Sequence, residues 1–422
     1  MSPLFRQEKI LSLCLVGGCL PVATPVISAN FESPDSVENT IAQQNSQQVS
    51  WRKQLAASGF TMGADYFSLG LISSDGADGK SVDAASGVAR LYGSWSLLNR
   101  STNNNGSLIW KVEHRHAYSD SSPKNFAFID NFSGKDGLGY AGLIAPAFSD
   151  QGFRVTDLNW KQKINQGKGT IMVGWQDVTN YVDVYALASP WSGFTNLAFS
   201  TGSGVMGLPD DGILALSVGH MLGENFYIVA GIADANGRSD DIFDGFETVF
   251  GSDASYFSTL ELGWTTSHEA IYTDNVHITL WDFGDDTRHN LNYPTPGYTD
   301  GGQGINVSWS QFLTPQIMPF IRGGVSEGEV ALYDKSLSVG LGYFGLGSPN
   351  NNLGFAINWS EINEEILQPI SNSDNQWTTE LYYNIQFGNH VQITPDLQFI
   401  DSPAFSSESS AWVFGLRARV FI

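Results

Sequence analysis

Residues 411–422 read AWVFGLRARVFI, and their side chains alternate between two kinds. The even-numbered positions, from Trp412 and Phe414 to Ile422, are all apolar, whereas Arg417 and Arg419 occupy the opposite face of an extended chain. Successive side chains of a strand point to opposite sides, so this stretch predicts a β-strand with one apolar and one charged face.

The same alternation continues through most of the chain. In residues 107–118, Leu108 and Trp110 share one face, while Lys111 and Glu113 share the other. About sixteen such strands are predicted, at residues 60–71, 86–98, 107–118, 153–164, 169–176, 212–221, 225–233, 255–266, 273–283, 303–313, 316–326, 335–344, 352–360, 376–388, 390–400 and 411–422. The apolar face is the core in a soluble sandwich, but it faces lipid in an outer-membrane barrel.

The lengths of the connections separate these two architectures. Joins after even-numbered strands are short, whereas joins after odd-numbered strands are mostly long, as at 119–152, 177–211, 234–254 and 284–302. A barrel threaded across a membrane requires this sorting, with turns on one side and loops on the other. We therefore predict an all-β fold, a transmembrane antiparallel up-and-down β-barrel of about sixteen strands with inward-folded long loops. A seventeenth strand at 195–200 is rejected, because it would put every later loop out of phase.

The N-terminal part of the chain divides into two segments before the barrel. Arg6 and Lys9 precede an apolar stretch at 10–20, and Ala29 ends a small-residue sequence, so residues 1–29 are predicted to be a secretory signal peptide. An alternative is lipidation at Cys19. Residues 30–58 form a polar lead or periplasmic segment, which is flexible or plug-like, and residues 59–422 form the barrel domain.

Composition excludes several classes of protein. The chain has 43 acids and 21 bases, a formal charge of −22, which disfavours nucleic acid as a partner. Its 13% aromatic content is too high for a disordered acidic protein. No later stretch supplies about twenty uninterrupted apolar residues, so a transmembrane helix is not predicted.

Charged residues on the predicted strands indicate a pore constriction. Lys111, Glu113 and Arg115 form one inward row, with Arg90 on the neighbouring strand. Charges inside a membrane-spanning element are costly unless they line water or pair, so an aqueous constriction is expected. A structural ion-pair ladder is the alternative, and both roles are compatible. Inward positions carry more bases than acids overall, which predicts a positive wall.

The loop at 177–211 mixes carboxylates with aromatic rings. Asp177, Tyr185, Trp191 and Phe194 are its candidates for the substrate path. Sugars stack their C–H faces on rings and hydrogen-bond through their hydroxyls, so this mixture suits carbohydrate. The alternative for each aromatic residue is packing of the folded loop against the wall.

Signals for catalysis are weak. Residues 324–328 match G-x-S-x-G, but they join two predicted strands, whereas the catalytic motif requires a strand, a sharp turn and a helix. We therefore expect no enzyme activity, no cofactor and no metal site.

The long outer loops hold many of the acidic residues of the chain. Our hypothesis is that divalent cations bridge these loops to lipopolysaccharide.

Several segments together resemble one known family. They are RLYGSW at 90–95, the stretch from 106 to KVEHRH at 111–116, WSGFTN at 191–196, LP at 208–209, ADANG at 233–237, ELYY at 380–383 and ITPDLQ at 393–398. This set resembles the carbohydrate-selective porins of the OprB type. The resemblance implies a sixteen-stranded outer-membrane barrel through which sugars diffuse, narrowed by inward loops and by a charged eyelet at Glu113 and Arg115, with Lys111 and Arg90 beside them.

The function predicted from the sequence is passive, substrate-biased diffusion of monosaccharides or small oligosaccharides through the outer membrane. The expected partners are carbohydrate solutes, outer-membrane lipid and lipopolysaccharide, and the barrel assembly machinery. A general ion or solute porin, a barrel enzyme and a secreted soluble β-protein that binds glycans are the alternatives.

Overall fold

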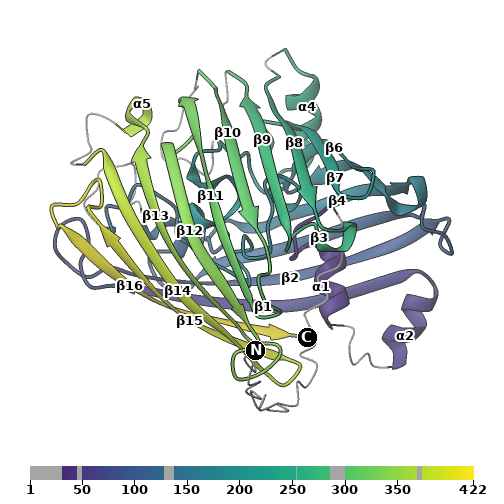
Figure 1. Ribbon diagram of the computed structural model, residues 1–422, viewed down its shortest axis with the longest axis horizontal. Coiled ribbons are helices and arrows are strands. Elements are labelled where there is room, and N and C mark those ends of the chain that lie inside the picture. The colour runs from purple at the N-terminus through teal and green to yellow at the C-terminus, as the bar shows by residue number, and fades with distance from the viewer. Residues whose placement is uncertain (1–30, 45–49, 128–136, 253, 286–299, 368–372) are drawn as a thin grey trace, which may run out of the picture.

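Sixteen antiparallel strands close into one barrel in the described residues of the computed structural model (Figure 1), and each strand pairs with its neighbours in the chain. The structure describes residues 31–44, 50–127, 137–252, 254–285, 300–367 and 373–422. The strands are β1 (Phe60–Ser73), β2 (Asp83–Leu98), β3 (Gly106–Ala117), β4 (Gly152–Ile164), β5 (Gly169–Gln176), β6 (Ile213–Leu222), β7 (Phe226–Asp234), β8 (Tyr256–Thr265), β9 (Asn275–Phe283), β10 (Gly302–Ser310), β11 (Ile317–Gly328), β12 (Tyr333–Phe344), β13 (Asn352–Ile362), β14 (Asn375–Phe387), β15 (Val391–Asp401) and β16 (Ser410–Phe421).

The predicted fold is confirmed. All sixteen predicted strands are present, and their ends differ from the prediction by a few residues. Residues 195–200, rejected as a strand, contain the short helix η5 (Leu197–Phe199), which is followed by η6 (Thr201–Gly204). Alternation predicts strands well because it reports directly on which face of a sheet meets lipid.

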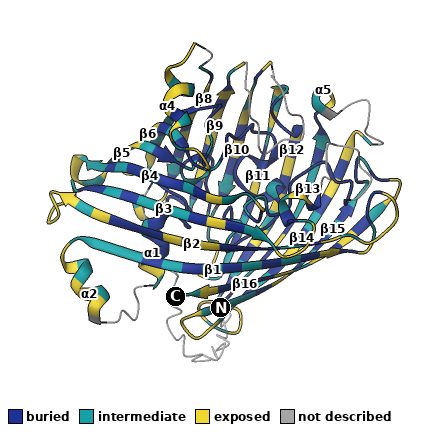
Figure 2. Cartoon of the chain, turned by 180° about the vertical axis from the view of Figure 1, so that it is seen from behind, coloured by how far each residue is buried: buried dark blue, intermediate teal, exposed yellow. Residues whose placement is uncertain are grey.

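The apolar faces of the strands point outward. Trp412 and Phe414 of β16 are exposed, whereas Arg417 and Arg419 on its other face are buried inside the barrel. Figure 2 shows the same alternation of exposed and buried positions along the strands. A soluble sandwich would bury its apolar face, so this distribution indicates a barrel that faces lipid.

The two ends of the barrel differ in their connections. Most even-numbered strands are followed by short turns such as 99–105 and 223–225, and most odd-numbered strands by longer loops, which include α4 (Asp244–Phe250) and α5 (Glu364–Leu367). The join after β11, at 329–332, is a short exception. Figure 1 places α4 and α5 at the end opposite the C-terminus. Among the described residues, no helix is both long and apolar enough to cross a bilayer.

Two helices precede β1, in the polar lead that the sequence predicted to be flexible or plug-like. α1 (Val37–Gln44) packs against β1, β2 and β3, and residues of the 31–44 segment are buried inside the barrel. α2 (Ser50–Ala57) lies at the short-turn end, where Arg52 Nη2 donates a hydrogen bond of 2.7 Å to the Ile422 carbonyl. Hydrophobic alternation does not detect these helices, because neither is long enough to show a helical period clearly.

The seam that closes the barrel is held by an ion-pair cluster as well as by backbone pairing. β1 pairs with β16 from Asp65 and Phe421 to Ser73 and Val413. The Asp65 carboxylate accepts a hydrogen bond of 2.7 Å from Arg90 Nη2 on β2 and another of 2.7 Å from Arg419 Nη2 on β16. One buried carboxylate therefore connects three strands across the closure.

Replacing Asp65 with Ala should destabilise the barrel. The change leaves the Arg90 and Arg419 guanidinium groups buried beside each other without their shared carboxylate, which costs about 3–5 kcal/mol for a buried pair. The free energy of unfolding in detergent or lipid measures the loss. Asp78→Ala is the control, because it removes a carboxylate from an exposed pair with Lys80, and it should leave the stability unchanged. Equal stability of both variants would contradict a role for the cluster at the seam.

Candidate pore constriction

Two long loops fold into the barrel and pair with each other. The first inward loop (118–151, described at 118–127 and 137–151) contains α3 (Pro123–Phe126), and the second inward loop (177–212) contains η4 (Val178–Asn180), η5 and η6. Ile144 and Asn196 form an isolated antiparallel bridge. The Ala145 amide donates to the Thr195 carbonyl at 2.7 Å. The two loops therefore form one layer inside the lumen.

Glu380 on β14 anchors the second inward loop to the far side of the wall. Its carboxylate accepts hydrogen bonds from the Thr195 amide at 2.6 Å and from the Asn196 amide at 3.0 Å. Backbone amides of a loop need such partners once water is excluded. The loop leaves the wall at β5, so this contact indicates that it crosses the lumen.

Asp183 provides a second anchor, directed at another part of the wall. Its carboxylate accepts from Arg322 Nη2 on β11 at 2.7 Å, lies 2.8 Å from His277 Nε2 on β9 and accepts from the Gly202 amide at 2.7 Å. Its backbone has a φ of 49°, in the left-handed region that Asp tolerates better than most residues. Sequence reasoning passed over Asp183 as an anchor, because its partners are distant in the chain.

Arg417 on β16 forms the third anchor. Its guanidinium donates to the Pro190 carbonyl at 2.6 Å and to the Gly193 carbonyl at 3.0 Å. These two carbonyls flank Trp191, so the anchor holds the turn that carries this ring. Wall positions on β9, β11, β14 and β16, in the half of the barrel away from β5, thus fix the second inward loop.

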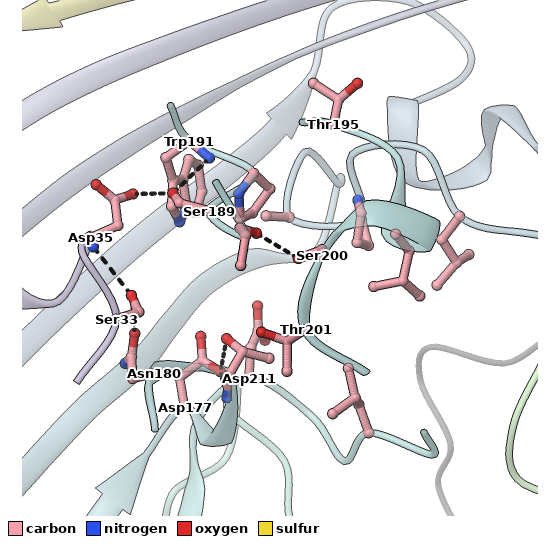
Figure 3. A pocket seen from close by; sticks show the side chains of 18 of the residues that line it. Ser33, Asp35, Asp177, Asn180, Ser189, Trp191, Thr195, Ser200, Thr201 and Asp211 are labelled. Carbon is pink, nitrogen blue, oxygen red and sulfur yellow. Dashed lines mark hydrogen bonds between the residues drawn. The ribbon is translucent and has the colours of Figure 1, made fainter. Parts of the chain in front are cut away.

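A cavity of about 110 Å³ lies where the two loops meet β3 and the N-terminal segment, residues 31–44 (Figure 3). Four of the eight sequence-predicted site residues line it: Glu113, Arg115, Asp177 and Trp191. These side chains come from β3 and from the second inward loop, which the fold brings together.

Arg90 and Lys111 lie in the surrounding wall and are engaged in ion pairs. Arg90 pairs with Asp65, lies 3.7 Å from Asp35, and has its guanidinium carbon 4.4 Å from the centroid of the Trp191 ring. Lys111 Nζ lies 3.0 Å from the Asp157 carboxylate. Arg90 therefore reaches the cavity through Trp191, whereas the partner of Lys111, Asp157, lies outside the cavity lining.

Tyr185 and Phe194 pack against the wall and are absent from the residues that line the cavity. The Tyr185 hydroxyl donates to the Phe199 carbonyl at 2.8 Å, and Phe194 contacts Tyr382 with ring centroids 5.0 Å apart. Both side chains are fully buried. For these two aromatics the structure shows the packing role that the sequence left open.

The cavity contains acidic residues that sequence reasoning missed. Asp35 and Asp211 line it together with Glu113 and Asp177, against the single guanidinium of Arg115. Arg115 pairs with Glu113 at 2.6 Å and with Asp211 at 2.5 Å. The sequence predicted a positive wall from the inward positions of the strands alone. The acids Asp35 and Asp211 come instead from the N-terminal segment and the second inward loop. The only sequence signal was the acidic pair that follows Leu208 and Pro209.

The pKa values of two loop carboxylates, Asp177 and Asp211, are shifted in opposite directions. Burial raises the pKa of Asp177, and the attraction of Lys111 offsets only part of this effect. Burial would also raise the pKa of Asp211, but the guanidinium groups of Arg115 and Arg154 outweigh it and hold that pKa well below its ordinary value.

Comparison with known proteins identifies the family. Residues 81–420 match the family described as "Carbohydrate-selective porin, OprB family". The chain belongs to this family. An OprB-type porin acts as an outer-membrane channel and not as an enzyme, in agreement with the class and location expected from the sequence.

Solved structures share the fold of this porin. The high-pH structure of Pseudomonas putida OprB has a TM-score of 0.71 and 18% sequence identity, with 88% of this chain and 96% of that chain covered. Its low-pH structure has a TM-score of 0.50 and 15% identity, covering 88% and 95%. The curated Porin AaxA of Chlamydia abortus is 28% identical over 119 residues, which is 28% of this chain and 27% of the relative's own length.

Removing the Glu380 anchor should widen the pore. Glu380→Ala deprives the Thr195 and Asn196 amides of their acceptor, so the second inward loop should leave its position and the single-channel conductance should rise. Glu361→Ala is the control, because Glu361 on β13 pairs with Lys335 at a partly exposed site. A Glu380→Ala channel with the conductance of the parent protein would exclude this anchor as the determinant of pore width.

The excess of acids in the cavity should favour cations, and lowering the pH should reduce this preference in two stages. Asp177, with its raised pKa, loses its charge first as the pH falls toward the ordinary aspartate value of about 4, and Asp211 keeps its charge below it. The reversal potential in a KCl gradient measures this change. Asp177→Asn should reduce the first stage, and Asp211→Asn should preserve it. If Asp211→Asn removed the first stage and Asp177→Asn left it unchanged, the pKa directions given for these two aspartates would be wrong.

Proposed function

We propose that this porin passes monosaccharides or small oligosaccharides by passive diffusion along the cavity between the inward loops. The observation that carries the proposal is the position of Trp191, a half-buried ring that lines the cavity among carboxylates and hydroxyls. A sugar presents an apolar C–H face and a rim of hydroxyls, so one ring with polar groups around it matches its surface. No reaction and no cofactor is part of this function.

The surroundings of Trp191 support a role as a stacking platform. Its ring lies 4.9 Å from the Phe67 ring and 5.3 Å from the Phe148 ring, measured between centroids. The Arg90 guanidinium lies against it, and the Arg417 anchor holds its backbone turn. A ring held in place loses little conformational freedom when a solute stacks on it, which favours a weak but selective contact.

The polar groups of the cavity can serve sugar hydroxyls. Carboxylate oxygens of Asp35, Asp177 and Asp211 accept hydrogen bonds, and the Arg115 guanidinium donates them. Figure 3 shows the aspartates arranged around the space beside Trp191. Contacts of this kind admit a neutral polyol and release it again, as a diffusion channel requires. The excess of carboxylates disfavours anionic sugars.

Replacing Trp191 with Ala should weaken glucose binding in the channel. Loss of one aromatic stacking contact, worth about 0.5–1.5 kcal/mol, corresponds to a roughly 2- to 12-fold weaker affinity. Glucose-induced fluctuation of the single-channel current gives the affinity, and swelling of proteoliposomes gives the uptake rate. Trp377→Ala, which changes an exposed ring on the outside of β14, is the matched control.

Two outcomes would count against the proposal. Equal glucose affinity in the parent and Trp191→Ala channels would remove Trp191 from the sugar path. Failure of glucose to enter liposomes or to modulate the current of the parent channel would favour a general ion or solute porin.

We propose further that residues 1–29 direct export and are removed after Ala29. These residues lie outside the described part of the chain, and the proposal rests on their sequence alone. The remaining chain would insert through the barrel assembly machinery into outer-membrane lipid and lipopolysaccharide. The N-terminal sequence of protein extracted from outer membranes with detergent tests this. A start at Asn30 is expected, whereas a lipidated Cys19 at the N-terminus would support the alternative.

A further inference from the structure

The N-terminal segment, residues 31–44, lies inside the barrel near its short-turn end. Glu32 and Glu38 both pair with Lys161 of β4, and the Glu38 carboxylate lies 2.9 Å from Lys161 Nζ and 3.8 Å from Lys163 Nζ. Lys161 and Lys163 immediately precede the short turn after β4. The acids of the segment therefore meet the bases of the wall between the constriction and this end of the barrel.

The segment also contacts the constriction itself. Ser189 Oγ on the second inward loop donates to the Asp35 carboxylate at 3.1 Å, and Ser33 Oγ donates to Asn180 Oδ1 at 3.3 Å. Asp35 lies 3.7 Å from Arg90 of β2. Polar contacts thus join the segment both to the loop above it and to the wall beside it.

Apolar contacts seat the segment against the inner surface of the barrel. Val37 and Ile41 of α1 pack in one cluster with Tyr92 of β2 and Ile109 of β3. On the opposite side, a Cβ atom at Gly219 of β6 would come within 2.6 Å of the Phe31 ring, so glycine makes room for it. Lumenal side chains in a wide barrel normally face water, and their burial here indicates a built contact.

Little space remains between the segment and this part of the wall. The cavity lined by Glu32, Val37, Ile109 and Asp177, among others, has a volume of about 10 Å³. A single water molecule needs roughly 10–15 Å³ of such volume, so a sugar cannot pass on this side of the segment.

We propose that residues 31–44 act as a plug that narrows the lumen below the constriction and sets the ion selectivity of the porin. Its three carboxylates, Glu32, Asp35 and Glu38, neutralise wall bases that would otherwise face the channel. With the plug in place the wall bases are neutralised, and the excess acids of the cavity make the lumen favour cations. Without it, Lys161, Lys163 and Arg90 make the inner half of the lumen attractive to anions. This inference concerns width and ion preference, and it holds whether or not sugars follow the route proposed above.

Deletion of residues 31–44 tests both parts of the proposal. The deleted channel should show a conductance higher by on the order of twofold, because a barrel of this strand number is wide enough for an open aqueous channel. Its reversal potential in a KCl gradient should shift toward that of chloride. Resistance of the barrel to unfolding in gel sample buffer without heating verifies that the deleted protein folds. A folded deletion variant with the conductance and reversal potential of the parent would overturn the plug.

A substitution that keeps the volume of the plug separates charge from width, and it remains informative if the deletion variant does not fold. Glu32→Gln with Glu38→Gln should shift the reversal potential toward chloride at nearly constant conductance. Adding Lys161→Gln should reverse much of the shift, because it removes the base that the two acids neutralise. Glu364→Gln with Glu365→Gln removes the same charge from α5 at the outer end, and it should have a much smaller effect. An equal shift in this control, or none in the plug variant, would overturn the assignment of selectivity to the plug.

Discussion

The requirement that every backbone polar group be paired in hydrocarbon determines the rest of this structure. Strands can meet it only by closing on themselves, so β1 must pair with β16 and the apolar side chains must point outward. A barrel of sixteen strands then encloses a lumen too wide for wall side chains to fill. The charged faces of the strands are left around that lumen, and they become the attachment points for whatever enters it.

Those attachment points explain why the loops and the N-terminal segment have defined positions inside the barrel. Glu380, Arg322 and Arg417 each hold a different part of the second inward loop, and Lys161 holds the N-terminal segment. A buried charge without a partner is strongly destabilising, so each wall charge favours one seating of the chain over others. The same ion pairs that position the constriction also set its electrostatics.

The sequence offers a physical rule for the wall residues of the site that it does not offer for the loop residues. Glu113 and Arg115 follow from alternation along one strand, because a strand residue has only two directions to face. Trp191 and Phe194 are three positions apart on the same loop, yet one lines the cavity and the other is buried against Tyr382. No periodicity of the sequence distinguishes these two residues, because the direction of a loop side chain depends on contacts with distant strands.

The sequence by itself determined the barrel, its strand number, the sorting of long and short connections and the inward row at Glu113 and Arg115. These features arise from local alternation and from the length of each connection, both of which can be read along the chain. Only the tertiary structure decided that Asp35, Asp211 and Trp191 line one cavity with Arg115, and that residues 31–44 enter the lumen. The reason is physical: these contacts join segments far apart in the chain, and each forms only after the barrel has closed and brought their partners to one place.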